Sequence, residues 1–87
     1  MCALAVGAAL AEPSHTLATE CALRETKAII LIEDHGAAGD IPSDKLAAAG
    51  FTIFKARWIC YEGRVDEALA LYDSILSLGP VVATKSR

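Results

Sequence analysis

The sequence predicts an all-α fold, a three-helix bundle formed by a single domain. Three segments carry apolar residues at helical spacing, and glycine and proline separate them at residues 36–42, at Gly63 and at Gly79-Pro80. The chain has 87 residues, of which 54% are hydrophobic, and a net charge of -3. This length allows one domain, and this composition excludes a disordered chain.

We place the helical domain at residues 13–80, before a tail at residues 81–87. Residues 1–12 admit two interpretations. One is a loose, weakly helical N-terminus. The other is the end of a signal peptide, because Ala9-Leu10-Ala11 has the small-x-small form that signal peptidase recognises. Removal of Met1–Ala11 would make the protein periplasmic or secreted; its retention would leave it cytoplasmic, and the localisation stays open.

The first predicted helix begins at Ser14, a candidate N-cap, and ends before Gly36. Helical spacing relates Leu17, Cys21, Arg24, Ala28, Leu31 and His35. Its segment Ala28–Ile32 is apolar on every side, so periodicity alone cannot assign it. The β-branched isoleucines there favour a strand.

The second predicted helix begins at Ser43, another candidate N-cap, and ends at the C′ glycine Gly63. Gly50 weakens its interior. Spacings of four, three, four and three residues relate Ala47, Phe51, Phe54, Trp58 and Tyr61. We interpret this row as the core face of the helix.

The third predicted helix covers residues 64–78 and stops at Gly79-Pro80. Acidic residues in its first turn, Asp66 and Glu67, complement the positive end of the helix dipole. Its apolar stripe comprises Val65, Ala68, Leu69, Tyr72, Ile75 and Leu76.

A small residue, a turn glycine, an alanine, an aromatic residue and a final proline follow one another at Ala56, Gly63, Ala68, Tyr72 and Pro80. In this order they resemble a single tetratricopeptide repeat, over about Lys45–Pro80. The sequence departs from the family pattern at Thr52, Lys55 and Ile59. The resemblance implies a helical hairpin and, by analogy, a groove that binds peptides.

A second resemblance is the alternative. The segment KAIILIEDHG followed by LAAAGFTIFKA is similar to the first part of a response-regulator receiver domain. It implies an α/β signalling module in which Glu33 and Asp34 help to hold Mg²⁺. The sequence departs from that family because it lacks the later strand that carries the phosphoacceptor aspartate.

Antiparallel packing of the predicted helices predicts two sets of facing residues. A turn near residue 39 puts Cys21 within one helical turn of Cys60, and we expect these two residues to form a disulfide if the protein is exported. The alternative is that both are small buried apolar residues. A turn about Gly63 puts Phe54 opposite Tyr72, Phe51 opposite Ile75, and Trp58 opposite Ala68 and Leu69.

The only compact polar cluster is Glu33-Asp34-His35. It fits a solvated helix end, with a metal or acid–base site as the alternative reading. No nucleophile motif, nucleotide loop or zinc spacing appears, and His15 has no partner nearby in sequence. We therefore expect no catalysis and no cofactor.

The expected role is structural or protein-binding, with a protein partner or a second copy as the ligand. A pI near 5.2 argues against nucleic acid, and no apolar run reaches the roughly 18 residues of a membrane span. Two surfaces are candidates for binding. One is the isoleucine patch of Ile29, Ile30 and Ile32, and the other is a groove lined by Phe54, Trp58 and Tyr72.

Overall fold

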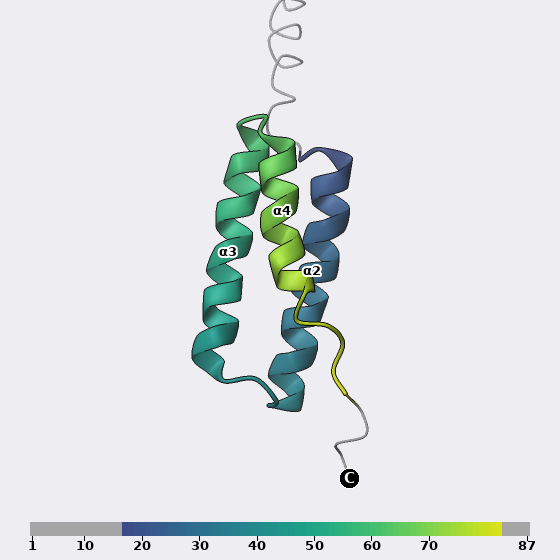
Figure 1. The fold of residues 1–87 in the computed structure, drawn as a ribbon, viewed down its shortest axis with the longest axis vertical. Helices are drawn as coiled ribbons and strands as arrows, with labels where there is room; N and C mark the ends of the chain where they lie inside the picture. Colours follow the sequence, from purple (N-terminus) through teal and green to yellow (C-terminus); the bar gives the residue numbers. More distant parts are fainter. Residues whose placement is uncertain (1–16, 83–87) are drawn as a thin grey trace, which may run out of the picture.

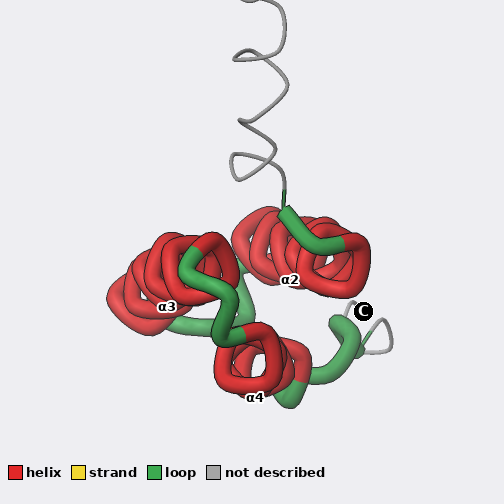
Figure 2. The backbone as a smooth tube through the Cα atoms, turned by 90° about the horizontal axis from the view of Figure 1, so that it is seen from above, coloured by secondary structure: helices red, strands yellow, loops and turns green. Residues whose placement is uncertain are grey.

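The structure is a computed structural model that describes residues 17–82 of the chain. Helix α2 spans Thr19–Ala38, α3 spans Ser43–Tyr61 and α4 spans Val65–Leu76. Consecutive helices run antiparallel (Figure 1), and seen from above the three lie at the corners of a triangle (Figure 2). The predicted all-α three-helix bundle is confirmed.

Residues 17–82 contain no strand, so Ala28–Ile32 lies within α2 as the three-helix prediction requires, and the strand tendency of its isoleucines is not realised. The α/β architecture that the receiver resemblance implies is not present in this part of the chain. The predictions for the signal peptide and His15 lie outside the described residues, as does the tail from residue 83 on. The predicted helix start at Ser14 is wrong for α2, which begins at Thr19 after Ala18, an N-cap in an extended conformation.

Helix α2 ends three residues later than the sequence predicts. Gly36 is helical, and a Cβ there would meet Leu46 at an ordinary 3.8 Å. The end comes at Gly39, whose φ of 66° is left-handed and whose N–H donates to the carbonyl of His35. Glycine adopts this conformation without steric cost, so Gly39 rather than Gly36 is the stop signal.

Helix α3 starts one residue away from the predicted cap, because Pro42 occupies the N-cap and Ser43 is already helical. Its predicted end is confirmed. Gly63 has a φ of 92°, its N–H donates to the Cys60 carbonyl at 2.9 Å, and the N–H of Arg64 donates to the Ile59 carbonyl at 3.2 Å. These two bonds form a Schellman motif, which turns the chain sharply into α4.

The core is built on small residues where the helices approach one another. Each helix contributes one fully buried alanine, namely Ala28, Ala56 and Ala68. Tyr72 of α4 is the largest fully buried side chain, and the predicted apolar stripe of α4 packs inward as expected. The rest of the buried core comprises Cys21, Ile53, Ile59, Cys60 and Ile75.

The predicted core face of α3 is wrong. Phe51, Phe54 and Trp58 are 71%, 61% and 66% exposed, and Tyr61 is 36% exposed. The face with Ile53, Ala56, Ile59 and Cys60 points inward in their place. The pairs predicted between Phe51, Phe54 or Trp58 and α4 therefore do not form.

The error has a physical cause, because α3 is apolar on both faces and its periodicity cannot choose between them. The position of Cys60 could have identified the inward face of α3. Cys60 follows Trp58 by two residues, which is about 200° around a helix. A disulfide from Cys60 to α2 therefore turns Trp58 away from the core.

Candidate interaction surface

The exposed face of α3 carries four of the five aromatic residues of the chain. We call Phe51, Phe54, Trp58 and Tyr61 the aromatic stripe. The Trp58 and Tyr61 rings meet edge to face, with centroids 6.4 Å apart. Cζ of Arg57 lies 5.4 Å from the centroid of the Phe54 ring, in a cation–π contact.

A groove between α2 and α3 borders the aromatic stripe. It offers about 260 Å³ of space and is lined by Ile29, Ile32, Glu33, Gly50, Ile53, Phe54 and Arg57. Gly50 contributes to the opening, since a Cβ there would meet nothing within 4 Å. The groove brings two predicted binding residues, Ile29 and Ile32, beside a third, Phe54.

The predicted isoleucine patch is not one surface. Ile29 and Ile32 pack partly against the core, on the α3 side of α2. Ile30 is 51% exposed and lines a different groove of about 310 Å³. That groove lies between α2 and the end of α4, and its other residues are Lys27, Leu31, Leu76, Gly79 and Pro80.

The predicted groove of Phe54, Trp58 and Tyr72 does not exist, because Tyr72 is fully buried while the other two face solvent. The hydroxyl of Tyr72 donates to Oε1 of Glu25 at 2.7 Å. Burial raises the pKa of Tyr72, and the acceptor carboxylate of Glu25 raises it further. Tyr72 is therefore a neutral donor inside the bundle.

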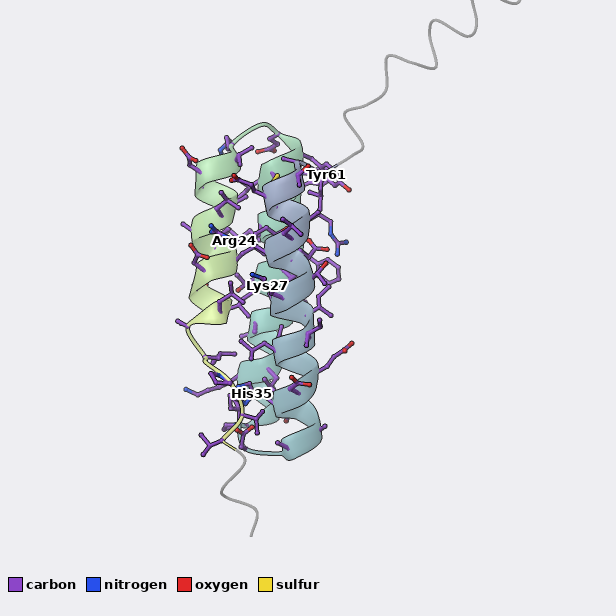
Figure 3. All side chains as sticks on the ribbon, turned by 90° about the vertical axis from the view of Figure 1, so that its right-hand side faces the viewer. Arg24, Lys27, His35 and Tyr61 are labelled. Atoms are coloured by element: carbon purple, nitrogen blue, oxygen red, sulfur yellow. A yellow bond between two sulfur atoms is a disulfide. The ribbon has the colours of Figure 1, made fainter. Side chains whose placement is uncertain are left out.

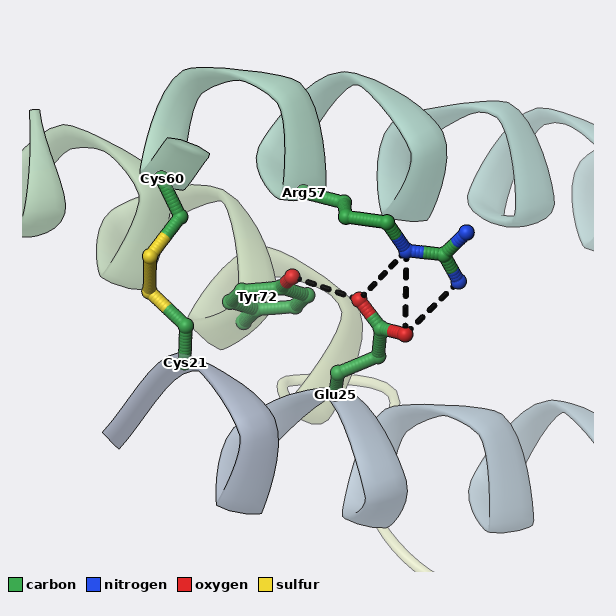
Figure 4. Close-up of a disulfide and its surroundings, with 5 residues drawn as sticks. All are labelled: Cys21, Glu25, Arg57, Cys60 and Tyr72. Atoms are coloured by element: carbon green, nitrogen blue, oxygen red, sulfur yellow. Dashed lines mark hydrogen bonds and ion pairs between the residues drawn. A yellow bond between two sulfur atoms is a disulfide. The ribbon is translucent and has the colours of Figure 1, made fainter. Parts of the chain in front are cut away.

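Glu25 is the centre of a polar cluster that joins all three helices (Figure 4). Besides Tyr72 of α4, it accepts from Arg57 of α3, with Nη2 to Oε2 at 2.7 Å and Nε to Oε1 at 3.2 Å. Burial alone would raise the pKa of Glu25, but the bonds from Arg57 and Tyr72 outweigh burial and lower it. The ionised carboxylate thus holds Arg57 in place beneath the Phe54 ring.

The disulfide lies one helical turn from this cluster, as Figure 4 shows. Cys21 of α2 and Cys60 of α3 are bonded, with their Cα atoms 6.8 Å apart. Both residues are buried. Glu25 and Arg57 were not identified as a pair from the sequence. The register of the cysteines was the signal that could have found them, because Glu25 follows Cys21 by four residues and Arg57 precedes Cys60 by three.

His35 lies in the last turn of α2 as expected, but it is buried and cross-links two segments instead of facing solvent. Its Nδ1 lies 2.8 Å from Oδ1 of Asp40, and its Nε2 lies 2.8 Å from the Gly79 carbonyl oxygen. Figure 3 shows it beside the segment that follows α4. Both partners can only accept, so the arrangement favours an imidazolium that donates from both nitrogens.

The surroundings of His35 favour its protonated, positively charged form. The Gly79 carbonyl, and then Asp40, raise the pKa of His35 above its usual value. Its sequence neighbours Glu33 and Asp34 are exposed. Among residues 17–82, no three His, Cys, Asp or Glu side chains come together in a way that could hold a metal ion.

No family model, curated protein or solved structure matches this chain. None of the helices described above combines the length and the apolar character needed to cross a bilayer. The geometry of the chain itself therefore carries the functional argument.

Proposed function

We propose that this protein is a protein-binding module without catalytic activity, and that the aromatic stripe of α3 is its binding surface. The observation that carries the proposal is the exposure of Phe51, Phe54 and Trp58 at 61–71% on one face of one helix. Cores of small domains normally take up such residues, and protein interfaces are enriched in aromatic residues and arginine.

The surface behind the stripe is held rigid, which suits binding. The disulfide fixes the end of α3 to α2, and Arg57 fixes the preceding turn of α3 through Glu25. A preorganised surface loses less entropy on association than a mobile one. The helical-hairpin resemblance to tetratricopeptide repeats supports a binding role by analogy, and a disulfide favours a role in an oxidising compartment.

Site-specific photo-cross-linking in the cells that make the protein tests the proposal. The photoreactive amino acid p-benzoylphenylalanine replaces Trp58 in one variant and Ala70, an exposed residue of α4, in the matched control. We expect protein adducts from position 58 and none from position 70. The adducts should disappear when Phe51→Ser is added, while the circular dichroism of the double variant stays helical.

Two results would contradict the proposal. One is the absence of adducts from position 58 under every growth condition that produces the protein. The other is an equal yield from positions 58 and 70, which would show contacts without preference for the stripe.

A further inference from the structure

We propose that the partner of the aromatic stripe is the same stripe on a second copy of this chain, packed antiparallel about a twofold axis. This inference rests on the proposed function and names its ligand. It follows from three properties of the stripe: its heptad spacing, the symmetry of that spacing along the helix, and the area that the stripe exposes.

The spacing is that of a coiled-coil seam. Ala47 and the four aromatic residues follow one another at intervals of four, three, four and three residues. These are the a and d positions of the heptad repeat, which mark the face that one helix turns toward another helix. Inside the bundle, α3 instead uses Ile53, Ala56 and Cys60, so this seam is not satisfied within one chain.

The spacing of the stripe is the same in both directions along the helix. Its intervals of three, four and three residues are symmetric about a point between Phe54 and Trp58. A twofold axis at that point sets Phe51 against Tyr61 of the partner subunit, and Phe54 against Trp58 of the partner subunit. Each a position then meets a d position, and the two α3 dipoles oppose each other. A self-complementary surface is what a symmetric dimer requires.

The exposed area of the stripe comes close to that of a small dimer interface. With about 200 Å² for a whole aromatic side chain, the exposed fractions leave about 450 Å² per copy on the stripe alone. Two copies would bury about 900 Å² from these side chains, close to the lower bound of about 1,000 Å² for a specific interface. Ala47 and the aliphatic stem of Lys55 border the stripe and supply further area.

Sedimentation equilibrium of the whole oxidised chain, at roughly 5–200 μM, tests the proposal against the two charged variants Phe54→Glu and Trp58→Glu. We expect a dimer for the natural sequence. Each variant should raise the dimer Kd by at least about 30-fold, because both residues lie at the centre of the interface. Ile30→Glu is the matched control, as it places the same charge on a residue that is 51% exposed on the other side of α2. It should leave the Kd unchanged, and circular dichroism should show all variants folded.

A second experiment tests whether the two α3 helices pack antiparallel. With p-benzoylphenylalanine at position 51, irradiation of the dimer and trypsin digestion should join peptide 46–55 of one copy to peptide 58–64 of the other. Cross-links between two copies of peptide 46–55 would show a parallel pair and overturn the proposed arrangement.

The outcomes separate this inference from the proposed function. A chain that stays monomeric at 200 μM, yet gives adducts with a different protein from position 58, overturns the dimer and supports the binding role. A monomer without adducts overturns both. A dimer that Ile30→Glu dissociates, and that Phe54→Glu does not, also overturns the inference.

Discussion

The two ends of the bundle are held by different chemistry. Where α2 begins and α3 ends, the Cys21–Cys60 disulfide and the Glu25 cluster join all three helices. Where α2 ends and α3 begins, His35 ties Asp40 of the connecting loop to Gly79 beyond α4. The first end thus depends on redox state and the second on the protonation of one imidazole.

The length of α4 explains the difference. It has 12 residues against 19 in α3, so it is about 10 Å shorter. It covers only the disulfide end. After a turn at Ser77 and Leu78, the non-helical residues 79–82 continue toward the other end (Figure 1). These non-helical residues need another tether, and the bond from His35 to the Gly79 carbonyl provides one.

Removal of the disulfide should have the largest effect, because it takes away the covalent link at the end where α2 begins and α3 ends. Reduction, or Cys21→Ala combined with Cys60→Ala, should lower the free energy of unfolding by about 4 kcal/mol, since the bridge closes a loop of 39 residues. Urea unfolding with and without dithiothreitol measures this. The double variant should not respond to reductant, whereas Cys2→Ala should respond as the natural chain does. A shift below about 1 kcal/mol would contradict the expectation.

Tyr72→Phe should weaken the same end less. It removes the 2.7 Å bond to Glu25 and leaves a largely buried carboxylate with one donor fewer, at a cost of about 1.5–3 kcal/mol. Ser74→Ala is the control on α4, because its exposed hydroxyl bonds only to the Leu71 carbonyl, and it should cost less than about 0.5 kcal/mol. Equal shifts in the urea midpoint for the two variants would show that the bond from Tyr72 to Glu25 adds nothing to stability.

A change of pH should act on the His35 end. The pKa of His35 is raised in the folded state, so its contribution is complete below the unfolded value of about 6.5 and is lost as the pH rises through the folded pKa. The melting temperature should therefore fall between pH 6 and pH 9. The pKa of Glu25 is lowered, so the disulfide end should lose stability only in acid.

The control for this prediction is His35→Gln, which cannot carry the charge and should show a flat profile over the same pH range. Hydrogen-exchange protection factors, which correct for the intrinsic rise of exchange with pH, should locate the effect. They should fall at high pH for the amides of residues 77–79, 81 and 82 and stay unchanged near Cys60. A uniform change along the chain would contradict a local role for His35.

The sequence predicts the helical framework of the bundle well, because the signals for helices and their ends are local in the chain. The end of α3 at Gly63, the inward stripe of α4 and the all-α class all follow from turn glycines and periodicity. The polar contacts were not predictable in the same way. His35 and Gly79 lie 44 residues apart, and no periodicity relates them.

The aromatic stripe shows most directly what the sequence alone could not predict. The sequence identified the row Phe51, Phe54, Trp58 and Tyr61 as one face, but assigned it to the interior. An apolar face is equally compatible with a core or an interface when the helix is apolar all round. Only the long-range partners of Arg57 and Cys60 decide which face points inward.

Gly50→Ala should have the smallest effect, since it changes α3 between the two ends of the bundle without touching the contacts at either end. Gly50 is helical, and an added Cβ would meet nothing within 4 Å, so alanine should stabilise the protein by about 0.5–1 kcal/mol. Gly63→Ala is the control, because a φ of 92° strains any other residue and should cost about 1–2 kcal/mol. Urea midpoints that move in opposite directions would show that backbone conformation, rather than the methyl group itself, decides the sign. If Gly50→Ala destabilised the protein, the open space beside Gly50 would have to be filled in solution, and the groove between α2 and α3 would lose its basis.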